Sequence, residues 1–189
     1  MKVLVVVDMQ NDFIDGALGT SEAVGIVDKV KAKIKRHLEE GGKVYYTQDT
    51  HSPNYLQTAE GQHLPVEHCV EGTEGWEIAP GIYHEPCQVI RKGTFGSLEL
   101  AEEIAHLPQP LESIELVGLC TDICVISNAL ILKASLPEIP IIVDAACCAG
   151  VTPESHRNAL DAMKMCQVEV KEQVRLELWA YNPKQFSED

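Results

Sequence analysis

Reactive side chains stand directly after apolar runs at four places in this sequence. If these runs are parallel strands of one α/β sheet, the side chains emerge at its carboxyl edge, where open α/β folds bind ligands. A carboxylate, an ammonium, a thiol and a metal-binding group would then meet in one crevice, and that combination suits acyl transfer on an amide or ester. The groups are Asp8 after Val3–Val7, Asp49 and His51 after Lys43–Gln48, Lys92 after Gln88–Ile90, and Cys124 beyond Ile114–Val117.

The rest of the chain continues the alternation of strands and helices. Such alternation is typical of a parallel sheet with right-handed crossovers. We therefore predict one α/β domain over 1–189, with a parallel six-stranded sheet and helices on both faces. A long loop at about 49–86 and a tail at about 175–189 fall outside the pattern. The expected helices are 22–40, 97–106, 122–135 and 153–165, with Ser97 and Thr152 as N-caps, and the last two strands are 139–143 and 168–170.

The composition narrows the class of protein. At 189 residues, with 45% hydrophobic and 23% charged residues, the chain has the size and make-up of one globular domain. A net charge of -14 disfavours nucleic acid and anionic membranes as partners, because both bind through clustered lysine and arginine. No apolar stretch approaches the roughly 20 residues that cross a bilayer. The seven cysteines are odd in number and lie mostly in apolar segments, which indicates reduced thiols and a cytoplasmic protein.

Cys124 is the candidate nucleophile. Residues 118–125 (GLCTDICV) turn from a strand into a helix, which Thr121 or Asp122 can cap. Cys124 then lies in the first helical turn, where unpaired N–H groups and the positive end of the helix dipole favour a thiolate and can hold an oxyanion. Most cysteines of such a domain are structural core residues. Cys120 is the nearest competitor, but it lies in the turn and lacks the advantage of the helix start.

A thiol that attacks an amide needs a proton acceptor and a partner for its charge. No histidine lies near the end of the first, third or fourth strand, so Asp8 and Lys92 are the ionisable groups that fit. Asp8 can take the proton of Cys124, and Lys92 can hold the negative charge. Taken singly, Asp8 would be a turn residue and Lys92 a solvated cation, but together at adjacent strand ends they favour function. Asp144, after the fifth strand, is expected to support the same crevice by hydrogen bonds.

Three motifs, in the same order over about residues 1–170, resemble the isochorismatase-like cysteine hydrolases. They are VDMQNDF at 7–13, RKGTFGS at 91–97 and GLCTDICV at 118–125. The resemblance implies a Rossmann-like sheet and a catalytic triad of Asp8, Lys92 and Cys124. It also implies a non-proline cis peptide at Leu119–Cys120, and an oxyanion hole formed by the backbone amides of Cys120 and Cys124.

A metal site is expected beside the nucleophile. Asp49 and His51 offer two ligands from one strand end, and the following loop adds Glu60, His63 and His68. Carboxylate and imidazole ligands suit zinc, iron or manganese, although a loop histidine taken alone is more often solvent-facing than a ligand. Residues 49–51 and 68–73 resemble metal motifs of the nicotinamidase branch, whereas isochorismatases proper lack that metal. The resemblance implies one divalent ion, zinc first and iron or manganese as alternatives, on Asp49, His51, Glu60 and His68, with His63 in reserve.

The substrate pocket departs from that branch at one point. Nicotinamidases commonly stack the pyridine ring between two aromatic side chains; Phe13 matches the first, but Pro65 stands where the second is a tryptophan. Tyr55 or Trp76 of the same loop could compensate, although either equally suits packing, and Leu64 with Pro65 could instead line a pocket for another small amide. We therefore expect Phe13, Leu64 and Tyr55 to contact the substrate.

These inferences predict a metal-dependent amidohydrolase that converts a small carboxamide, nicotinamide first, into an acid and ammonia through a thioester on Cys124. Two other classes stay open: an isochorismatase-type or carbamoyl-amide hydrolase without the metal, and a binding member of the fold without activity. The expected partner is a small-molecule amide, with neither nucleic acid nor membrane. A homo-oligomer is also expected, and the tail offers Leu176, Leu178, Trp179 and Tyr181 for its contact or for packing.

Overall fold

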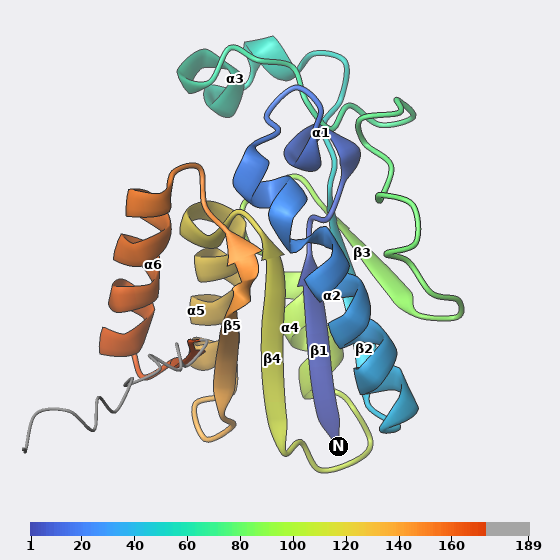
Figure 1. The fold of residues 1–189 in the computed structure, drawn as a ribbon, viewed down its shortest axis with the longest axis vertical. Coiled ribbons are helices and arrows are strands. Elements are labelled where there is room, and N and C mark those ends of the chain that lie inside the picture. Colours follow the sequence, from blue (N-terminus) through green and yellow to red (C-terminus); the bar gives the residue numbers. More distant parts are fainter. Residues whose placement is uncertain (173–189) are drawn as a thin grey trace, which may run out of the picture.

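The computed structural model describes residues 1–172 and places six parallel strands in one sheet (Figure 1). The strand order is β3-β2-β1-β4-β5-β6, so the chain builds the sheet outward from β1 on one side and from β4 on the other. The predicted parallel α/β sheet is confirmed. Its strand order reverses between β1 and β4, which is where such folds bind ligands. The strands are β1 Lys2–Val7, β2 Lys43–Asp49, β3 Gln88–Lys92, β4 Ser113–Leu119, β5 Ile141–Ala149 and β6 Glu169–Lys171.

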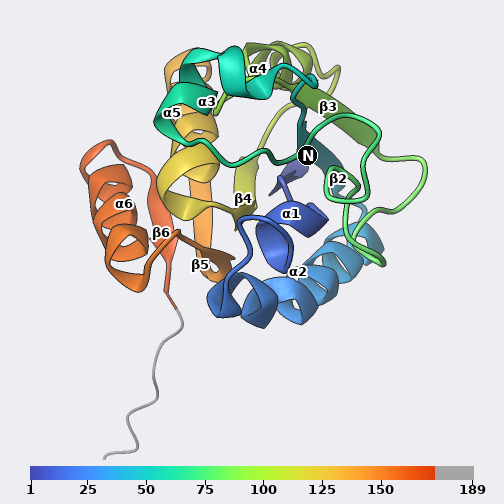
Figure 2. The same cartoon turned by 90° about the horizontal axis from the view of Figure 1, so that it is seen from above.

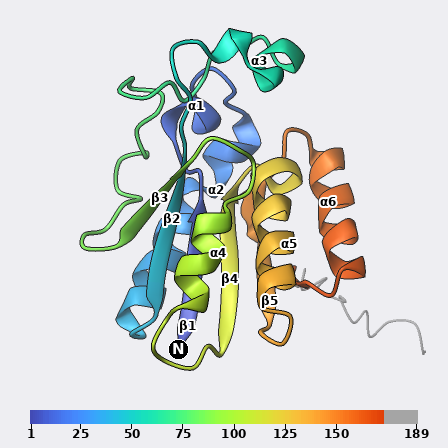
Figure 3. The same ribbon diagram turned by 180° about the vertical axis from the view of Figure 1, so that it is seen from behind.

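Helices cover both faces of the sheet (Figures 1 and 3). The helices α4, α5 and α6 pack on one face, and α1 and α2 pack on the other. Because both faces are covered, the apolar run of β1 from Val3 to Val7 is 0% exposed throughout. This continuous run therefore marks a central strand. The helices are α1 Asn11–Ile14, α2 Ser21–Glu39, α3 Ala59–His63, α4 Leu98–Ala105, α5 Ile126–Ser135 and α6 Pro153–Met165.

Two helices begin at the predicted caps. Ser97 Oγ accepts the backbone N–H of Leu100 at 3.1 Å. Thr152 Oγ1 accepts the N–H of Ser155 and Ser155 Oγ accepts the N–H of Thr152, both at 3.0 Å, which forms a capping box. Since α4 and α6 both begin at the carboxyl edge of the sheet, these caps also fix the loops that border the crevice.

The long loop after β2 folds over the carboxyl edge of the sheet (Figure 2). It contains a 3-10 turn at Tyr55–Gln57 and the helix α3, both too short to give a hydrophobic period. Isolated bridges join His51 to Val70 and Gln10 to Ile78, so the loop is tied to the sheet edge at two points. The loop is therefore a partly folded cover for the crevice.

The fifth strand extends further than the sequence pattern predicted, and this changes the place of Asp144. The strand β5 continues past Val143, and its register with β4 shifts by a bulge between Leu116 and Gly118. Asp144 therefore lies within the strand. Its Oδ2 is 2.5 Å from Nζ of Lys33 on α2, and the same ammonium is 2.7 Å from Glu115 Oε1. The prediction that Asp144 supports the crevice by hydrogen bonds is wrong, because its carboxylate pairs with Lys33 of α2.

No helix among residues 1–172 has the length and apolar character needed to span a bilayer. The tail residues Leu176, Leu178, Trp179 and Tyr181 lie outside the described residues. Their role in packing or oligomer contact stays a prediction.

Candidate active site

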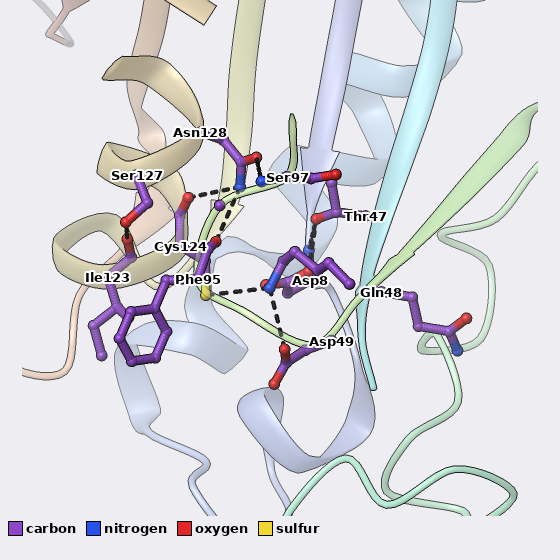
Figure 4. Close-up of polar contacts among 12 residues, drawn as sticks. Asp8, Thr47, Gln48, Asp49, Phe95, Ser97, Ile123, Cys124, Ser127 and Asn128 are labelled. Carbon is purple, nitrogen blue, oxygen red and sulfur yellow. Dashed lines mark hydrogen bonds and ion pairs between the residues drawn. The ribbon is translucent and has the colours of Figure 1, made fainter. Parts of the chain in front are cut away.

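Lys92, at the end of β3, is the charged centre of a buried cluster. Its Nζ lies 2.7 Å from Asp8 Oδ2, 3.2 Å from Asp49 Oδ1 and 3.6 Å from Cys124 Sγ. Asp8, Asp49 and Cys124 of this cluster are labelled in Figure 4. The four residues are between 0% and 5% exposed. The structure thus brings together the three residues expected as a triad, from the ends of β1 and β3 and from the segment after β4.

The backbone at the ends of β1 and β4 sets this spacing. Asp8 directly follows β1 with a φ of 46°, a left-handed conformation that aspartate adopts more readily than most residues. Its Oδ1 accepts a hydrogen bond from Thr47 Oγ1 at 2.6 Å, so β2 orients the carboxylate. Gly118 has a φ of 118°, and a Cβ there would lie 2.1 Å from the carbonyl oxygen of Val7. Glycine therefore lets β4 run close to the end of β1.

Cys124 lies in a π-helical segment, Thr121–Val125, and not in the first turn of an α-helix as predicted. The N–H of Val125 bonds to the carbonyl of Cys120 at 3.0 Å, and the peptide between Leu119 and Cys120 is cis, as the resemblance implied. The predicted helix caps are wrong. Thr121 Oγ1 pairs with His156 Nδ1 at 2.7 Å, and the Asp122 carboxylate accepts the N–H of Val151 at 3.1 Å, so both side chains tie the segment to the start of α6.

Charges and burial set the protonation of the cluster. Burial raises the pKa of Cys124 well above its usual value, and Asp8 raises it further, while Lys92 lowers it. Burial also raises the pKa of Asp8 against the opposing effect of Lys92. Burial alone would lower the pKa of Lys92, but Asp8, Cys124 and Asp49 raise it above the ordinary value. Burial therefore favours the thiol of Cys124, the neighbouring carboxylates favour the ammonium of Lys92, and a thiolate at Cys124 must form by proton transfer.

A second group of ligating side chains borders this cluster. Asp49, His51 and His68 place one ligand atom each within 4.8 Å of the others, and all three residues are buried. Asp49 Oδ2 lies 2.9 Å from His51 Nε2 and 3.8 Å from His68 Nε2. Glu60 Oε1, from α3, lies 3.7 Å from each of these two nitrogens. Two imidazoles and two carboxylates thus face one point, while the other oxygen of Asp49 contacts Lys92.

The available ligand atoms of these residues fit a divalent metal ion. His51 Nε2 is buried without a hydrogen bond of good geometry, although Asp49 is close. His68 bonds through Nδ1 to the carbonyl of Val66 at 2.8 Å, which leaves Nε2 as the ligand atom and fixes the ring. His63, the reserve candidate, is exposed and its Nδ1 bonds to the carbonyl of Ala59 at 2.7 Å. The geometry therefore supports Glu60 over His63 as a companion to the other three.

Comparison with known proteins decides the family. A family model described as an isochorismatase domain matches residues 2–173. The chain belongs to the isochorismatase family. The nicotinamidase/pyrazinamidase of Mycobacterium tuberculosis is 27% identical over 187 residues, which cover 90% of this chain and 98% of that protein.

Solved structures of similar sequence share this fold. A pyrazinamidase of Pyrococcus horikoshii in complex with zinc has a TM-score of 0.79 at 27% identity, over 90% of this chain and 98% of that one. An N-carbamoylsarcosine amidase of Thermoplasma acidophilum has a TM-score of 0.73 at 27% identity, over 93% and 98% of the two chains. The predicted fold class and family are confirmed. The pyrazinamidase structure contains zinc, and Asp49, His51 and His68 of this chain form a candidate metal site.

One residue that sequence reasoning missed holds Asp49, a candidate metal ligand, in place. Gln10 is 0% exposed, and its side-chain amide pairs with the backbone of Asp49 in both directions. Gln10 Nε2 donates to the Asp49 carbonyl at 2.8 Å, and the Asp49 N–H donates to Gln10 Oε1 at 2.7 Å. The only sequence signal was the place of Gln10 in the VDMQNDF motif, two residues after Asp8.

The residues expected to contact the substrate have different surroundings. Phe13 is 8% exposed, and its ring centroid lies 5.5 Å from that of His68. Tyr55 is 0% exposed, packs 4.7 Å from His51 and 4.9 Å from His68 between centroids, and donates its hydroxyl to the Leu64 carbonyl at 2.9 Å. Leu64, which directly follows α3, is 37% exposed. Tyr55 thus holds the histidines and the loop, and its contact with substrate stays a prediction, as do those of Phe13 and Leu64.

Replacing His68 by alanine should weaken zinc binding. The candidate metal site would lose a buried imidazole that offers Nε2, so we expect zinc affinity to fall by more than the roughly 10- to 100-fold typical of an outer-shell partner. Equilibrium dialysis against buffered zinc, followed by elemental analysis, measures this. His63→Ala is the matched control, because that imidazole bonds to a backbone carbonyl on the surface. Equal zinc content in both variants and the wild type would contradict the assignment.

Proposed function

We propose that this protein is a metal-containing amidohydrolase that converts a small carboxamide, nicotinamide first, into the acid and ammonia. The observation that carries the proposal is the position of Lys92 Nζ, 2.7 Å from Asp8 and 3.6 Å from Cys124 within one buried cluster. A thiol, a carboxylate and an ammonium in such contact suit attack on an amide. The names of the relatives, nicotinamidase and pyrazinamidase, support a pyridine or pyrazine carboxamide as substrate.

In the first half of the reaction, Asp8 takes the thiol proton of Cys124 as the sulfur attacks the carboxamide carbon. Because burial raises the pKa of the thiol, formation of the nucleophile needs Asp8 as the acceptor of its proton. Lys92 remains an ammonium throughout and offsets the negative charge on sulfur. Its own pKa is raised by Asp8, Cys124 and Asp49 against the effect of burial, which keeps it charged.

The carbonyl oxygen becomes an oxyanion when the carbon–sulfur bond forms. The backbone amides of Cys120 and Cys124 are proposed to donate to it, as in the resembling family. Asp8 then passes its proton to the amide nitrogen, the carbon–nitrogen bond breaks, and ammonia leaves a thioester on Cys124. One carboxylate thus serves as base and then as acid.

Water hydrolyses the thioester in the second half. Asp8 takes a proton from the water as its oxygen attacks the thioester carbon, the carbon–sulfur bond breaks, and Asp8 returns the proton to sulfur. Asp49, His51, Glu60 and His68 are proposed to hold a divalent ion, with zinc first. That ion, when bound, would supply a Lewis acid for water or for a ring nitrogen of the substrate.

A second substrate class has support from one structural likeness. The N-carbamoylsarcosine amidase of Thermoplasma acidophilum is as similar in sequence, at 27% identity, as the pyrazinamidase structure. The proline at position 65 also leaves the expected ring sandwich without its second aromatic side chain. A carbamoyl amide would use the same Asp8, Lys92 and Cys124 chemistry without a ring to stack.

Ammonia release from a panel of small carboxamides separates these substrates. We expect nicotinamide and pyrazinamide to be hydrolysed fastest by the zinc-loaded protein. Fastest release from N-carbamoyl amino acids, unaffected by chelation, would favour the second class. If no carboxamide yields ammonia above the background, the amidohydrolase proposal is wrong and a binding role takes its place.

The remaining proposals concern the state of the protein in the cell. We propose one domain over the whole chain that works as a homo-oligomer in the cytoplasm, with a small amide as its partner. The cysteines among residues 1–172 are free thiols, which supports a reducing compartment.

A further inference from the structure

Asn128 is a buried polar residue that joins the nucleophile segment to the loop after Lys92. It lies on α5, one turn beyond Cys124, and is 0% exposed. Its Nδ2 donates to the carbonyl of Cys124 at 2.8 Å and to the carbonyl of Phe95 at 3.3 Å, while its Oδ1 accepts the N–H of Ser97 at 3.0 Å (Figure 4). One side chain thus bonds to the backbone of three residues that belong to two separate segments.

A second contact brings the same loop close to α5. Gly96 lies between Phe95 and Ser97, and a Cβ there would be 2.4 Å from Ile131 Cδ1 and 3.3 Å from Ser127 Cβ. Both neighbours are on the α5 surface that carries Asn128. A side chain at position 96 would hold the loop away from the helix, so glycine permits the approach that the hydrogen bonds of Asn128 require.

These contacts join the segments that carry Lys92 and Cys124. Lys92 ends β3, and the loop that leaves it is fixed at Phe95 and Ser97 by Asn128. Cys124 is held from the other side through its own carbonyl. Lys92 Nζ and Cys124 Sγ lie 3.6 Å apart, and they belong to the two segments that Asn128 joins.

We propose that Asn128 is a positioning residue, which sets the placement of the Cys124 thiol against Lys92 by tying the nucleophile segment to the loop of residues 93–97. The inference rests on the proposed function only in taking Cys124 as the reacting thiol. A buried asparagine that served stability alone would leave the reactivity of folded molecules unchanged. A positioning residue changes that reactivity, because displacements near 1 Å alter rates by roughly 100-fold.

The test compares Asn128→Ala with Ser127→Ala. Ser127 is the adjacent α5 residue, and its Oγ bonds to the Ile123 carbonyl at 2.6 Å without reaching the loop. The rate of iodoacetamide alkylation at Cys124, read by peptide mass spectrometry and normalised to the folded fraction, should fall roughly 10- to 100-fold in Asn128→Ala. The kcat for the best amide should fall by a similar factor with KM little changed. Ser127→Ala should match the wild type in both measurements.

A second variant serves if Asn128→Ala does not fold. Gly96→Ala leaves α5 intact and pushes the loop off the helix, so Cys124 alkylation should fall in the same direction by a smaller factor, since Ile131 can turn aside. Folded Asn128→Ala that alkylates at half the wild-type rate or faster overturns the proposal. If that variant is unfolded, alkylation of Gly96→Ala at the wild-type rate or faster overturns it.

The alkylation measurement does not depend on the substrate. A protein that releases no ammonia from any amide, yet shows the expected alkylation pattern, refutes the proposed function and supports the positioning role. Normal turnover of nicotinamide by folded Asn128→Ala refutes the positioning role and leaves the proposed function standing.

Discussion

Replacing Cys124 by alanine should reduce ammonia release by roughly 10⁴-fold or more, because no other group in the cluster can form the thioester. The fold should survive. Deleting one buried sulfur leaves a small cavity and lowers the free energy of unfolding by roughly 1 to 2 kcal/mol. Ammonia assays together with urea unfolding measure both effects on the same preparation.

Cys147→Ala is the matched control for this experiment. Cys147 is 5% exposed, as is Cys124, but it lies on β5 away from Lys92 and Asp8. Its alanine variant should lose a comparable amount of stability and keep its activity. A Cys124→Ala protein that retains more than about a tenth of wild-type activity would show that sulfur is not the nucleophile.

The second large effect is expected from Asp8→Asn. The amide has nearly the shape of the carboxylate but cannot accept the thiol proton, so kcat should fall by roughly 10³-fold. Because burial holds the pKa of Cys124 high, the variant has no easy route to the thiolate. Lys92 keeps Asp49 as its partner at 3.2 Å, so the protein should remain folded.

Asp144→Asn provides the comparison. Lys33 contacts Asp144 and Glu115 much as Lys92 contacts Asp8 and Asp49: an ammonium between two carboxylates. Removing one carboxylate from the Lys33 group should reduce stability without changing kcat. Equal loss of activity in both variants would mean that Asp8 acts through stability and not as a base.

The fold was predictable because its strands carry strong local signals. The apolar run Val3–Val7 gave the central strand, and Thr152 with Pro153 gave the start of α6. The end of β5 was not predictable, because the bulge opposite Leu116 and Gly118 depends on pairing with a strand far away in sequence. Because Asp144 is polar, the sequence pattern placed the end of the strand before it. Within β5 its charge is neutralised by Lys33 of α2.

The candidate site was predictable in its residue types but not in its protonation or its support. The carboxyl ends of parallel strands brought Asp8 and Lys92 together. The expectation of adjacent strands was wrong, because β2 lies between β1 and β3 and the long lysine side chain reaches across its end. The raised pKa of Cys124 arises from burial among groups that meet only in three dimensions. Asn128 gave no signal, since a polar residue on a helix is usually solvated, and its partners Phe95 and Ser97 lie about thirty residues earlier.

Competition with hydroxylamine tests whether Cys124 carries the acyl group during turnover. A thioester partitions between water and hydroxylamine, so the hydroxamate should form at the expense of the acid while ammonia release continues. Cys124→Ala should yield neither product. Acid as the sole product at every hydroxylamine concentration, with ammonia release intact, would show that water attacks the amide directly and that no thioester forms on Cys124.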